Sequence, residues 1–276
     1  VLTVDDAMNP NFPVIHKNLI GKDLGEEVLS TNVAEHFRHE AGDLIKGYNQ
    51  ATTIVEGSFE MPMVHQGYIE PHNATAIWKS DGKIEVWTST QGAFGARNAL
   101  APILDVPDTD IKVTPLEIGG GFGGKLDVSV QPILAVAAWL MKQPVCTVYS
   151  RAESMISSTK RHPAKIKVRA STDSKGYLQS FELNGDFDTG AYASWGPTVA
   201  SRVPVHCTGP YSVPRIHCRT RAIYTNNPPS GAFRGFGTPQ AALAQELLYD
   251  ELAEKLDIDR LEFRLLNAFR PGDITP

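Results

Sequence analysis

The sequence contains a run of glycines that constrains the fold around it. Five of the six residues from Gly119 to Gly124 are glycines, and Lys125 follows them (GGGFGGK). A strand is predicted just before this run, over residues 111–118, and an apolar helix after it that ends at Met141. Glycine lets main-chain amides approach a ligand closely, and the N-terminus of a helix attracts negative charge. We therefore expect this loop to bind an anionic group, a phosphate or another oxyanion.

Two phosphate-binding motifs partly match this run, and each lacks one required residue. The GxGxxG spacing that starts at Gly119 is typical of dinucleotide-binding folds, which also need an acidic residue about twenty positions later for the ribose. No Asp or Glu occurs between residues 128 and 152. The run also resembles a P-loop, but Leu126 stands where the magnesium-binding Ser or Thr would follow Lys125. A nucleotide hydrolase is therefore a disfavoured alternative, which magnesium-dependent ATP binding by the chain would support.

A second glycine-rich loop, residues 231–237 (GAFRGFG), has the same style and contains Arg234. Thr238 and Pro239 follow it and open a long helix, since Pro is tolerated in the first turn of a helix. Glycines around Arg234 let the backbone turn tightly while the guanidinium group points at an oxygen-rich partner. Two such loops favour one shared buried cofactor, although Arg234 alone could be a structural arginine paired with a carboxylate.

Charge, cysteine content and hydropathy limit the partners of the chain. With 26 Lys and Arg against 31 Asp and Glu, the formal charge is −5, which excludes a broad nucleic-acid-binding surface. Cys146, Cys207 and Cys218 lack CxxC spacing and cannot hold zinc or an iron–sulfur cluster by themselves, so we expect a reducing, cytoplasmic setting. The longest apolar stretch, residues 132–141, is too short to cross a membrane. Neither nucleic acid nor membrane is an expected partner.

Several histidine and aromatic residues are open to two interpretations. The eight histidines form no HExxH metal motif, and we expect His65 and His72 to lie in turns or to contact neighbouring residues. Tyr192 and Trp195 could line a pocket, but burial in a core is the commoner position for such aromatic residues.

Strand and helix patterns mix without strict alternation, which predicts an α+β fold with two mixed subdomains. Hairpins are expected where residues 80–82 and residues 173–176 supply turn residues between alternating segments. The expected strands cover residues 52–60, 74–79, 83–88, 111–118, 145–149, 164–171, 177–188 and 219–224, and the expected helices cover residues 31–40 and 93–104 besides those ending at Met141 and starting at Thr238.

Three motifs occur in a fixed order along the sequence: Ser89-Thr90-Gln91, Gly119–Lys125 and Gly231–Gln240 (GAFRGFGTPQ). Together they resemble the molybdopterin-binding subunit of the xanthine dehydrogenase/aldehyde oxidoreductase family, the molybdenum hydroxylases. Residues 261–273 also look like the segment that follows the same helix in that family.

The resemblance has consequences for the domain organisation. It implies that residues 58–276 form the molybdenum-cofactor-binding domain of the xanthine dehydrogenase family, with two mixed α/β subdomains of roughly 58–150 and 151–276. It also implies that residues 1–57 are a connector that follows the family's small N-terminal hammerhead domain, which this sequence lacks.

The resemblance also assigns site residues. In the family's pattern Gln91 lies beside the oxo ligand of molybdenum, Arg202 stabilises charge on the substrate and Phe236 stacks on the substrate ring. These three are the expected catalytic residues, and no residue of this chain is expected to ligate the metal directly. The expected cofactor-binding residues are Gln91, Gly120, Gly121, Phe122, Gly123, Ala232, Phe233 and Arg234. Taken singly, Gln91 could end a strand, Phe236 could be core and Arg202 could pair on the surface.

The implied activity is hydroxylation of a heteroaromatic ring with oxygen from water. The sequence most resembles the nicotinate-hydroxylating branch, so conversion of nicotinate to 6-hydroxynicotinate is the first choice. Purine-oxidising members carry a glutamate after the glycine-loop lysine, whereas this chain has Leu126, so oxidation of xanthine or hypoxanthine is an alternative, as is oxidation of an aldehyde. A non-catalytic scaffold subunit is the alternative of another class.

The resemblance finally implies cofactors and partners. The cofactor would be molybdopterin with molybdenum, in its cytosine dinucleotide form. The glutamate that acts as base in the family belongs to the C-terminal half of the subunit, so a second molybdopterin subunit or a C-terminal half would supply it. FAD and 2Fe–2S clusters would reside on partner subunits, because the cysteines of this chain are too few and too scattered to hold the clusters.

Overall fold

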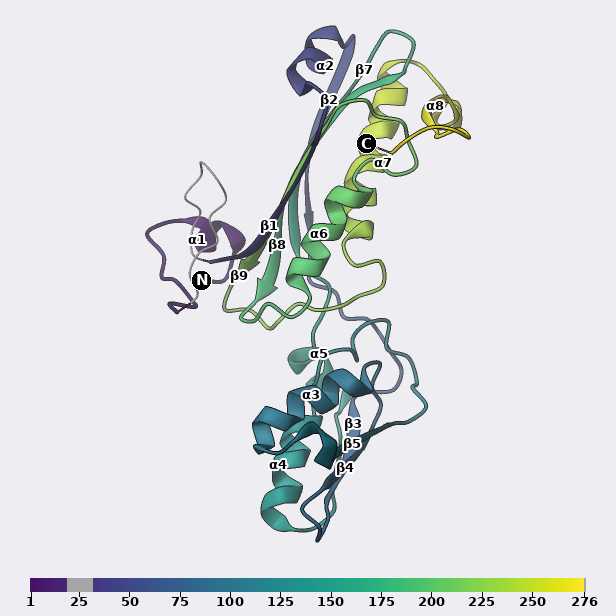
Figure 1. The fold of residues 1–276 in the computed structure, drawn as a ribbon. Coiled ribbons are helices and arrows are strands. Elements are labelled where there is room, and N and C mark those ends of the chain that lie inside the picture. Colours follow the sequence, from purple (N-terminus) through teal and green to yellow (C-terminus); the bar gives the residue numbers. More distant parts are fainter. Residues whose placement is uncertain (19–31, 276) are drawn as a thin grey trace. The chain divides into compact units, whose positions relative to one another are not determined.

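The structure is a computed structural model that describes residues 1–18 and 32–275 (Figure 1). The chain divides into two compact units, and neither of them is continuous in sequence. Unit 1 comprises residues 1–62, 162–227 and 235–276, and unit 2 comprises residues 63–161 and 228–234.

Unit 1 is built on a five-stranded sheet with the order β1-β9-β8-β7-β2. Neighbouring strands are antiparallel except β8 and β9, which are parallel. The strands are β1 (Val33–Ala41), β2 (Thr53–Met61), β7 (Ala164–Thr172), β8 (Leu178–Gly190) and β9 (Ile216–Tyr224).

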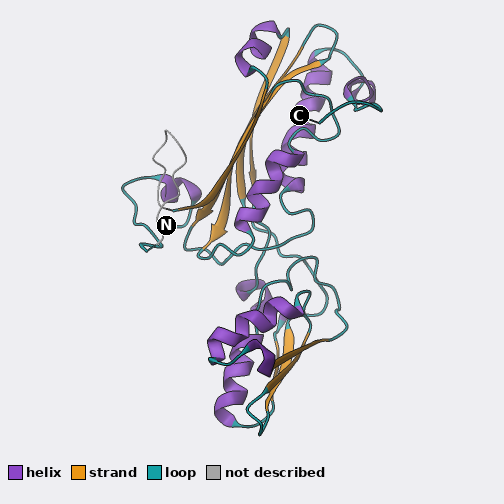
Figure 2. Ribbon diagram, viewed as in Figure 1, coloured by secondary structure: helices purple, strands orange, loops and turns teal. Residues whose placement is uncertain are grey.

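Two long helices cover one face of this sheet (Figure 2). Helix α6 (Gly196–His206) packs against β1 and β9, and α7 (Thr238–Lys255) packs against β2 and β7. Alternate strand residues such as Ile166, Phe181 and Leu183 point at these helices and are fully buried, as the two-residue period of a strand requires. The shorter helices of unit 1 are α1 (Val4–Met8), α2 (Leu44–Gln50) and α8 (Arg260–Asn267).

Unit 2 has a smaller sheet with the order β5-β4-β3-β6, in which only β4 and β5 run parallel. Ala76, Val86, Leu100 and Leu134 belong to its own buried core, between the sheet and helices α3 and α4. The elements are β3 (Asn73–Trp78), β4 (Ile84–Thr88), α3 (Ala93–Leu104), a 3₁₀ turn (Asp108–Asp110), β5 (Ile111–Pro115), α4 (Gln131–Met141), β6 (Val145–Val148) and α5 (Arg151–Ser157).

Both expected hairpins are present, as β3–β4 and β7–β8, and α3 has the expected bounds. The helix expected over residues 31–40 is wrong: Val33–Ala41 is strand β1, paired with β9, while residue 31 lies outside the described residues. The reason is a two-residue period, since Phe37 packs on the core whereas Arg38 and Glu40 are exposed.

The division of the chain differs from the expected boundaries near residues 57 and 150. Strand β2 pairs with β7 along its whole length up to Met61, so residues 1–62 belong with unit 1. The chain then forms unit 2 up to Arg161, and it contributes to unit 2 again with residues 228–234.

Candidate functional site

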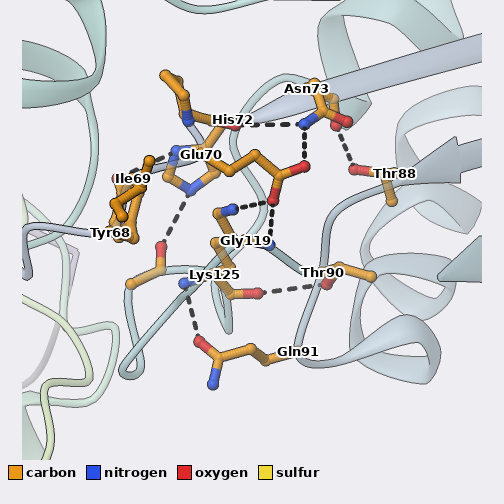
Figure 3. Close-up of polar contacts among 12 residues, drawn as sticks. Tyr68, Ile69, Glu70, His72, Asn73, Thr88, Thr90, Gln91, Gly119 and Lys125 are labelled. Atoms are coloured by element: carbon orange, nitrogen blue, oxygen red, sulfur yellow. Dashed lines mark hydrogen bonds and ion pairs between the residues drawn. The ribbon is translucent and has the colours of Figure 1, made fainter. Parts of the chain in front are cut away.

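The glycine loop of unit 2 is held at its start by Glu70. The Gly119 N–H donates to Glu70 Oε2 at 2.8 Å, and the Glu70 N–H donates to the Gly119 carbonyl at 3.1 Å (Figure 3). The loop is therefore tied to the segment that leads into β3, about fifty residues earlier in the chain.

Lys125 closes the other end of the loop on the same carboxylate. Its side chain is fully buried, and its Nζ lies 2.6 Å from Glu70 Oε2 and 5.1 Å from the centre of the Tyr68 ring. Burial is the largest single influence on the Glu70 pKa and raises it. Hydrogen bonds from Lys125, Gly119 and Asn73 together outweigh burial and hold that pKa below its ordinary value. Glu70 is thus a carboxylate at neutral pH, as a buried ammonium group requires.

Gln91 lies beneath the middle of the loop. Its side-chain Oε1 accepts the main-chain N–H groups of Gly123 at 2.9 Å and Lys125 at 3.2 Å. The main-chain N–H of Gln91 donates to the Lys125 carbonyl at 2.9 Å. A Cβ atom on Gly121 would lie 2.5 Å from Gln91 Oε1, so the close approach requires glycine there. Since Oε1 is used twice, the exposed Nε2 group is left as a donor, and no described residue accepts from it.

His72 supports the last glycine of the run. Its Nε2 donates to the Gly124 carbonyl at 3.0 Å, and its Nδ1 accepts from the Tyr68 hydroxyl at 3.2 Å. Burial lowers the His72 pKa to about 4, so the ring is neutral at pH 7 and can hold both bonds. The Tyr68 hydroxyl also lies 2.8 Å from Ser154 Oγ in α5, which extends this buried network.

The second loop packs directly on the first within unit 2. The Arg234 N–H donates to the Phe122 carbonyl at 3.0 Å, and Gln66 Nε2 donates to the Ala232 carbonyl at 2.9 Å. Gly123 has φ +100°, and a Cβ there would meet the Ala232 carbonyl oxygen at 2.6 Å. The two loops therefore touch backbone to backbone.

Two neighbouring side chains of the second loop, Phe233 and Arg234, differ in their exposure to solvent. The Phe233 ring is half-buried and lies 3.9 Å from the Arg161 guanidinium carbon, while the Arg234 guanidinium group is exposed.

Three consecutive N–H groups of the glycine loop, those of Gly120, Gly121 and Phe122, have no acceptor among the described residues. Every other N–H from Gly119 to Leu126 donates a hydrogen bond within unit 2. Gly120 and Phe122 both have positive φ, +90° and +51°, on either side of Gly121. Successive amides in such a turn form a concave donor group that binds anions.

The glycine loop presents three such donors, and its expected place at a helix N-terminus is wrong. Helix α4 begins only at Gln131, after a turn that continues beyond Lys125, because the loop closes on Gln91 and Glu70 instead of continuing as helix. The second loop does open a helix: α7 begins at Thr238 with Pro239 in its first turn, as expected.

The residues expected to contact substrate lie in unit 1. Arg202 on α6 is exposed, with its guanidinium carbon 5.1 Å from the centre of the Phe236 ring. Trp195 meets the same ring edge-on at 5.8 Å and is half-buried, so it is not a core residue, and Tyr192 is 66% exposed. Phe236 has φ +43°, a strained backbone conformation for a residue other than glycine.

The eight expected cofactor-binding residues thus share unit 2, and Arg202 and Phe236 share unit 1. Sequence reasoning missed Tyr68, Glu70 and, as a supporting residue, His72. Their signal was a dense polar segment around Gly67 and Pro71 between two strands. In the described parts of the chain, no group of three or more His, Cys, Asp and Glu residues could hold a metal ion, and no helix is long and apolar enough to cross a membrane.

Comparisons with known proteins show which family this chain belongs to. Residues 26–268 match the molybdopterin cofactor-binding domain. The chain is 36% identical to the nicotinate dehydrogenase large molybdopterin subunit of Eubacterium barkeri over 272 residues, 99% of this chain and 61% of that protein. It is 33% identical to a probable xanthine dehydrogenase subunit of Bacillus subtilis (strain 168) over 99% of this chain and 35% of that protein.

A solved structure has the same fold. The aldehyde oxidoreductase of Desulfovibrio gigas superposes with a TM-score of 0.90 at 28% identity, covering 99% of this chain and 29% of the other. The chain spans about three fifths or less of the length of these proteins. The family match, the two relatives and the superposition confirm the resemblance drawn from the three sequence motifs, and they confirm the α+β fold class predicted from the strand and helix patterns. This chain belongs to the molybdopterin cofactor-binding domain family.

Proposed function

We propose that this chain is the molybdopterin-binding part of a molybdenum hydroxylase that hydroxylates a heteroaromatic substrate with oxygen from water. The observation that carries the proposal is the row of three N–H groups at Gly120, Gly121 and Phe122 without protein acceptors among the described residues. A buried framework holds these donors in place, so their orientation does not depend on a ligand.

The residues of unit 2 fit an anionic, oxygen-rich cofactor. The three amides would donate to its oxygen atoms, the free Nε2 of Gln91 would add a fourth donor, and the exposed Arg234 would add positive charge. When bound, molybdopterin supplies the metal centre that takes up the electrons of the oxidation. We propose the cytosine dinucleotide form, following the resemblance in the three motifs.

Nicotinate is the substrate that we propose. A flat pyridine ring can stack on Phe236, and the Arg202 guanidinium group can stabilise negative charge on the ring or pair with a carboxylate. Leu126 is apolar, so it cannot accept a hydrogen bond from a purine N–H. Support also comes from the Eubacterium barkeri relative, whose name states nicotinate. The Bacillus subtilis relative, named for xanthine dehydrogenase, keeps a purine as the second candidate.

The complete enzyme would need further polypeptide. We propose that a second molybdopterin subunit or a C-terminal half contributes the glutamate base, and that partner subunits carry FAD and 2Fe–2S clusters. A cytoplasmic setting accords with the free thiol of Cys146, which is exposed.

The test is purification of the complex from its native source, with identification of every chain and analysis of molybdenum and pterin. We expect both to be present, together with turnover of pyridine carboxylates in a substrate screen. A complex that contains neither metal nor pterin would contradict the proposal and leave a scaffold role. Turnover of purines or aldehydes alone would refute the substrate assignment and leave the cofactor site intact.

A further inference from the structure

The face of the unit 1 sheet opposite α6 and α7, called here the open face, carries three rows of polar side chains. Each row crosses all five strands in the order β2, β7, β8, β9, β1 and follows directly from the strand register. The first row is Glu60, Lys165, Asp186, Arg221 and His36; the middle row is Ser58, Lys167, Asn184, Arg219 and Arg38; the third row is Glu56, Arg169, Glu182, His217 and Glu40.

The first and third rows place an acid next to each base on neighbouring strands. In the first row, Arg221 Nε lies 2.7 Å from Asp186 Oδ1, and Lys165 Nζ lies 3.4 Å from Glu60 Oε1. Such cross-strand pairs of opposite charge stabilise a sheet. A carboxylate on β8 stands between a base on β7 and a base or histidine on β9 in both rows.

The middle row has no carboxylate of its own, although Asn184 Nδ2 donates to Glu182 Oε1 of the third row at 3.2 Å. Neutral Ser58 and Asn184 occupy the positions on β2 and β8 where the neighbouring rows have acids, and three cations remain. The side chains of Lys167 and Arg38 are exposed, and neither side chain makes a hydrogen bond or ion pair with a described residue. The contact of Arg219 is a distant one, 4.0 Å to Glu40, and its Nε is buried without a hydrogen bond.

The cations lie in a hollow and not on a flat surface. Its volume is about 560 Å³, and it is lined by the middle row together with residues of the first row and Asp5 of α1. The acids Asp5, Glu60 and Asp186 in this lining are paired with Lys165 or Arg221, whereas Arg38, Lys167 and Arg219 have no such partner within 3.5 Å among the described residues. Helices α1 and α2 lie on this side of the sheet (Figure 1) and pack against β8, α1 also against β9.

We propose that the middle row of the open face binds an extended acidic segment of another polypeptide. One carboxylate of the segment takes the position above Asn184, between Lys167 and Arg219. It thereby completes the alternation that Asp186 and Glu182 complete in the rows on either side. Lys167 and Arg219 lie two strand spacings apart, roughly 9.5 Å, so both long side chains can reach one carboxylate between them. A second acidic residue of the segment pairs with Arg38, and two joined contacts hold better than one exposed ion pair.

The test uses the full chain and a fluorescein-labelled peptide of alternating Glu and Ser, with a Gln–Ser peptide as the uncharged control. We expect the Glu peptide to bind in fluorescence anisotropy at low ionic strength, and to weaken with added salt, while the Gln peptide does not bind. Asn184→Asp puts the missing carboxylate on β8 itself, so we expect it to weaken binding about tenfold or more. Asn226→Asp, which adds the same charge at an exposed position outside the three rows, should bind as the unsubstituted chain does.

Three results would overturn the proposal. The first is that the Gln peptide binds as well as the Glu peptide, and the second is that Asn184→Asp binds the Glu peptide as well as the unsubstituted chain does. The third is that sodium phosphate displaces the peptide at a much lower concentration than sodium chloride does. The last would assign the hollow to a small oxyanion. If a thermal melt shows that Asn184→Asp is unfolded, Lys167→Gln replaces it, with the same expected loss and the same consequence if binding is unchanged.

Discussion

At the scale of single residues, the protonation of His72 is constrained by its burial beneath the glycine loop. Burial lowers its pKa to about 4, from 6.5 for a free imidazole, so the unfolded chain takes up this proton first as the pH falls. The folded state therefore loses stability between these two values. Linkage gives a loss of about 2 kcal/mol between pH 7 and pH 5 from this residue alone.

Urea unfolding at pH 7 and pH 5 measures this loss. His72→Gln keeps a hydrogen-bonding side chain but cannot titrate, so the variant should lose about 2 kcal/mol less between the two pH values than the unsubstituted chain. Equal losses in both proteins would mean that His72 does not carry the pH dependence.

Gly121 should be sensitive to a single methyl group. In Gly121→Ala the new Cβ would lie 2.5 Å from Gln91 Oε1, so that Gln91 must move and release the N–H groups of Gly123 and Lys125. We expect the purified complex to lose most of its molybdenum and pterin. Gly95→Ala, in α3 of the same unit with open space around the glycine, is the control and should keep both. Full cofactor content in Gly121→Ala would show that cofactor binding does not depend on the contact between Gly121 and Gln91.

Under the proposed function, a substitution of Arg202 is expected to separate substrate turnover from cofactor binding. Because it belongs to unit 1 with Phe236, Arg202→Met should reduce turnover of nicotinate by about tenfold or more while molybdenum content stays near normal. Arg270→Met, another exposed arginine of unit 1, should change neither. Parallel loss of turnover and of molybdenum would contradict a role in substrate contact.

At the scale of elements, α5 depends on its first residue. Ser150 Oγ accepts the Glu153 N–H while Glu153 accepts the Ser150 N–H, a complete capping box. Ser150→Ala should lower the free energy of unfolding by about 1 kcal/mol. Since α5 carries Ser154 to the Tyr68 hydroxyl, the same change should loosen the network below the glycine loop. Urea unfolding measures the loss, and Ser157→Ala, at the other end of α5, should cost less; equal losses would rule out the capping role.

The hairpins and α3 were predictable because local signals agree: turn residues lie between alternating segments, and α3 has a helical period of apolar residues. Helix α6 was not predicted, because Gly196, Pro197 and Pro204 look like helix breakers. Two of these residues stand in its first turn, where they cost little. The parallel pairings β4–β5 and β8–β9 join strands whose partnership no local pattern encodes.

The candidate site was predictable only where its residues form motifs. Gln91, the glycine loop and Arg234 stand in recognisable runs, whereas Glu70 acquires its importance from Lys125, fifty-five positions later. A lone glutamate in a turn gives no sign that a buried ammonium group will need it. The charge rows of the open face are likewise visible only once five strands are in register.

At the scale of the whole molecule, each unit has a core of its own, built mainly from apolar strand and helix residues. The chain passes between the units after residues 62, 161, 227 and 234. Unit 2 therefore receives its last piece, residues 228–234, from a distant part of the sequence, and that piece holds the carbonyl and N–H groups that meet Gly123 and Phe122.

This interrupted path sets a timetable for biosynthesis. The 66 residues from 162 to 227 are translated between the two parts of unit 2. At roughly 5–20 residues per second, about 3–13 seconds pass between translation of Arg161, the end of the first part of unit 2, and translation of the segment 228–234 that completes the unit. Until residues 228–234 have been translated, Gly123 and Phe122 lack the main-chain groups that they meet in the folded chain, so the contact between the two loops forms only after that point.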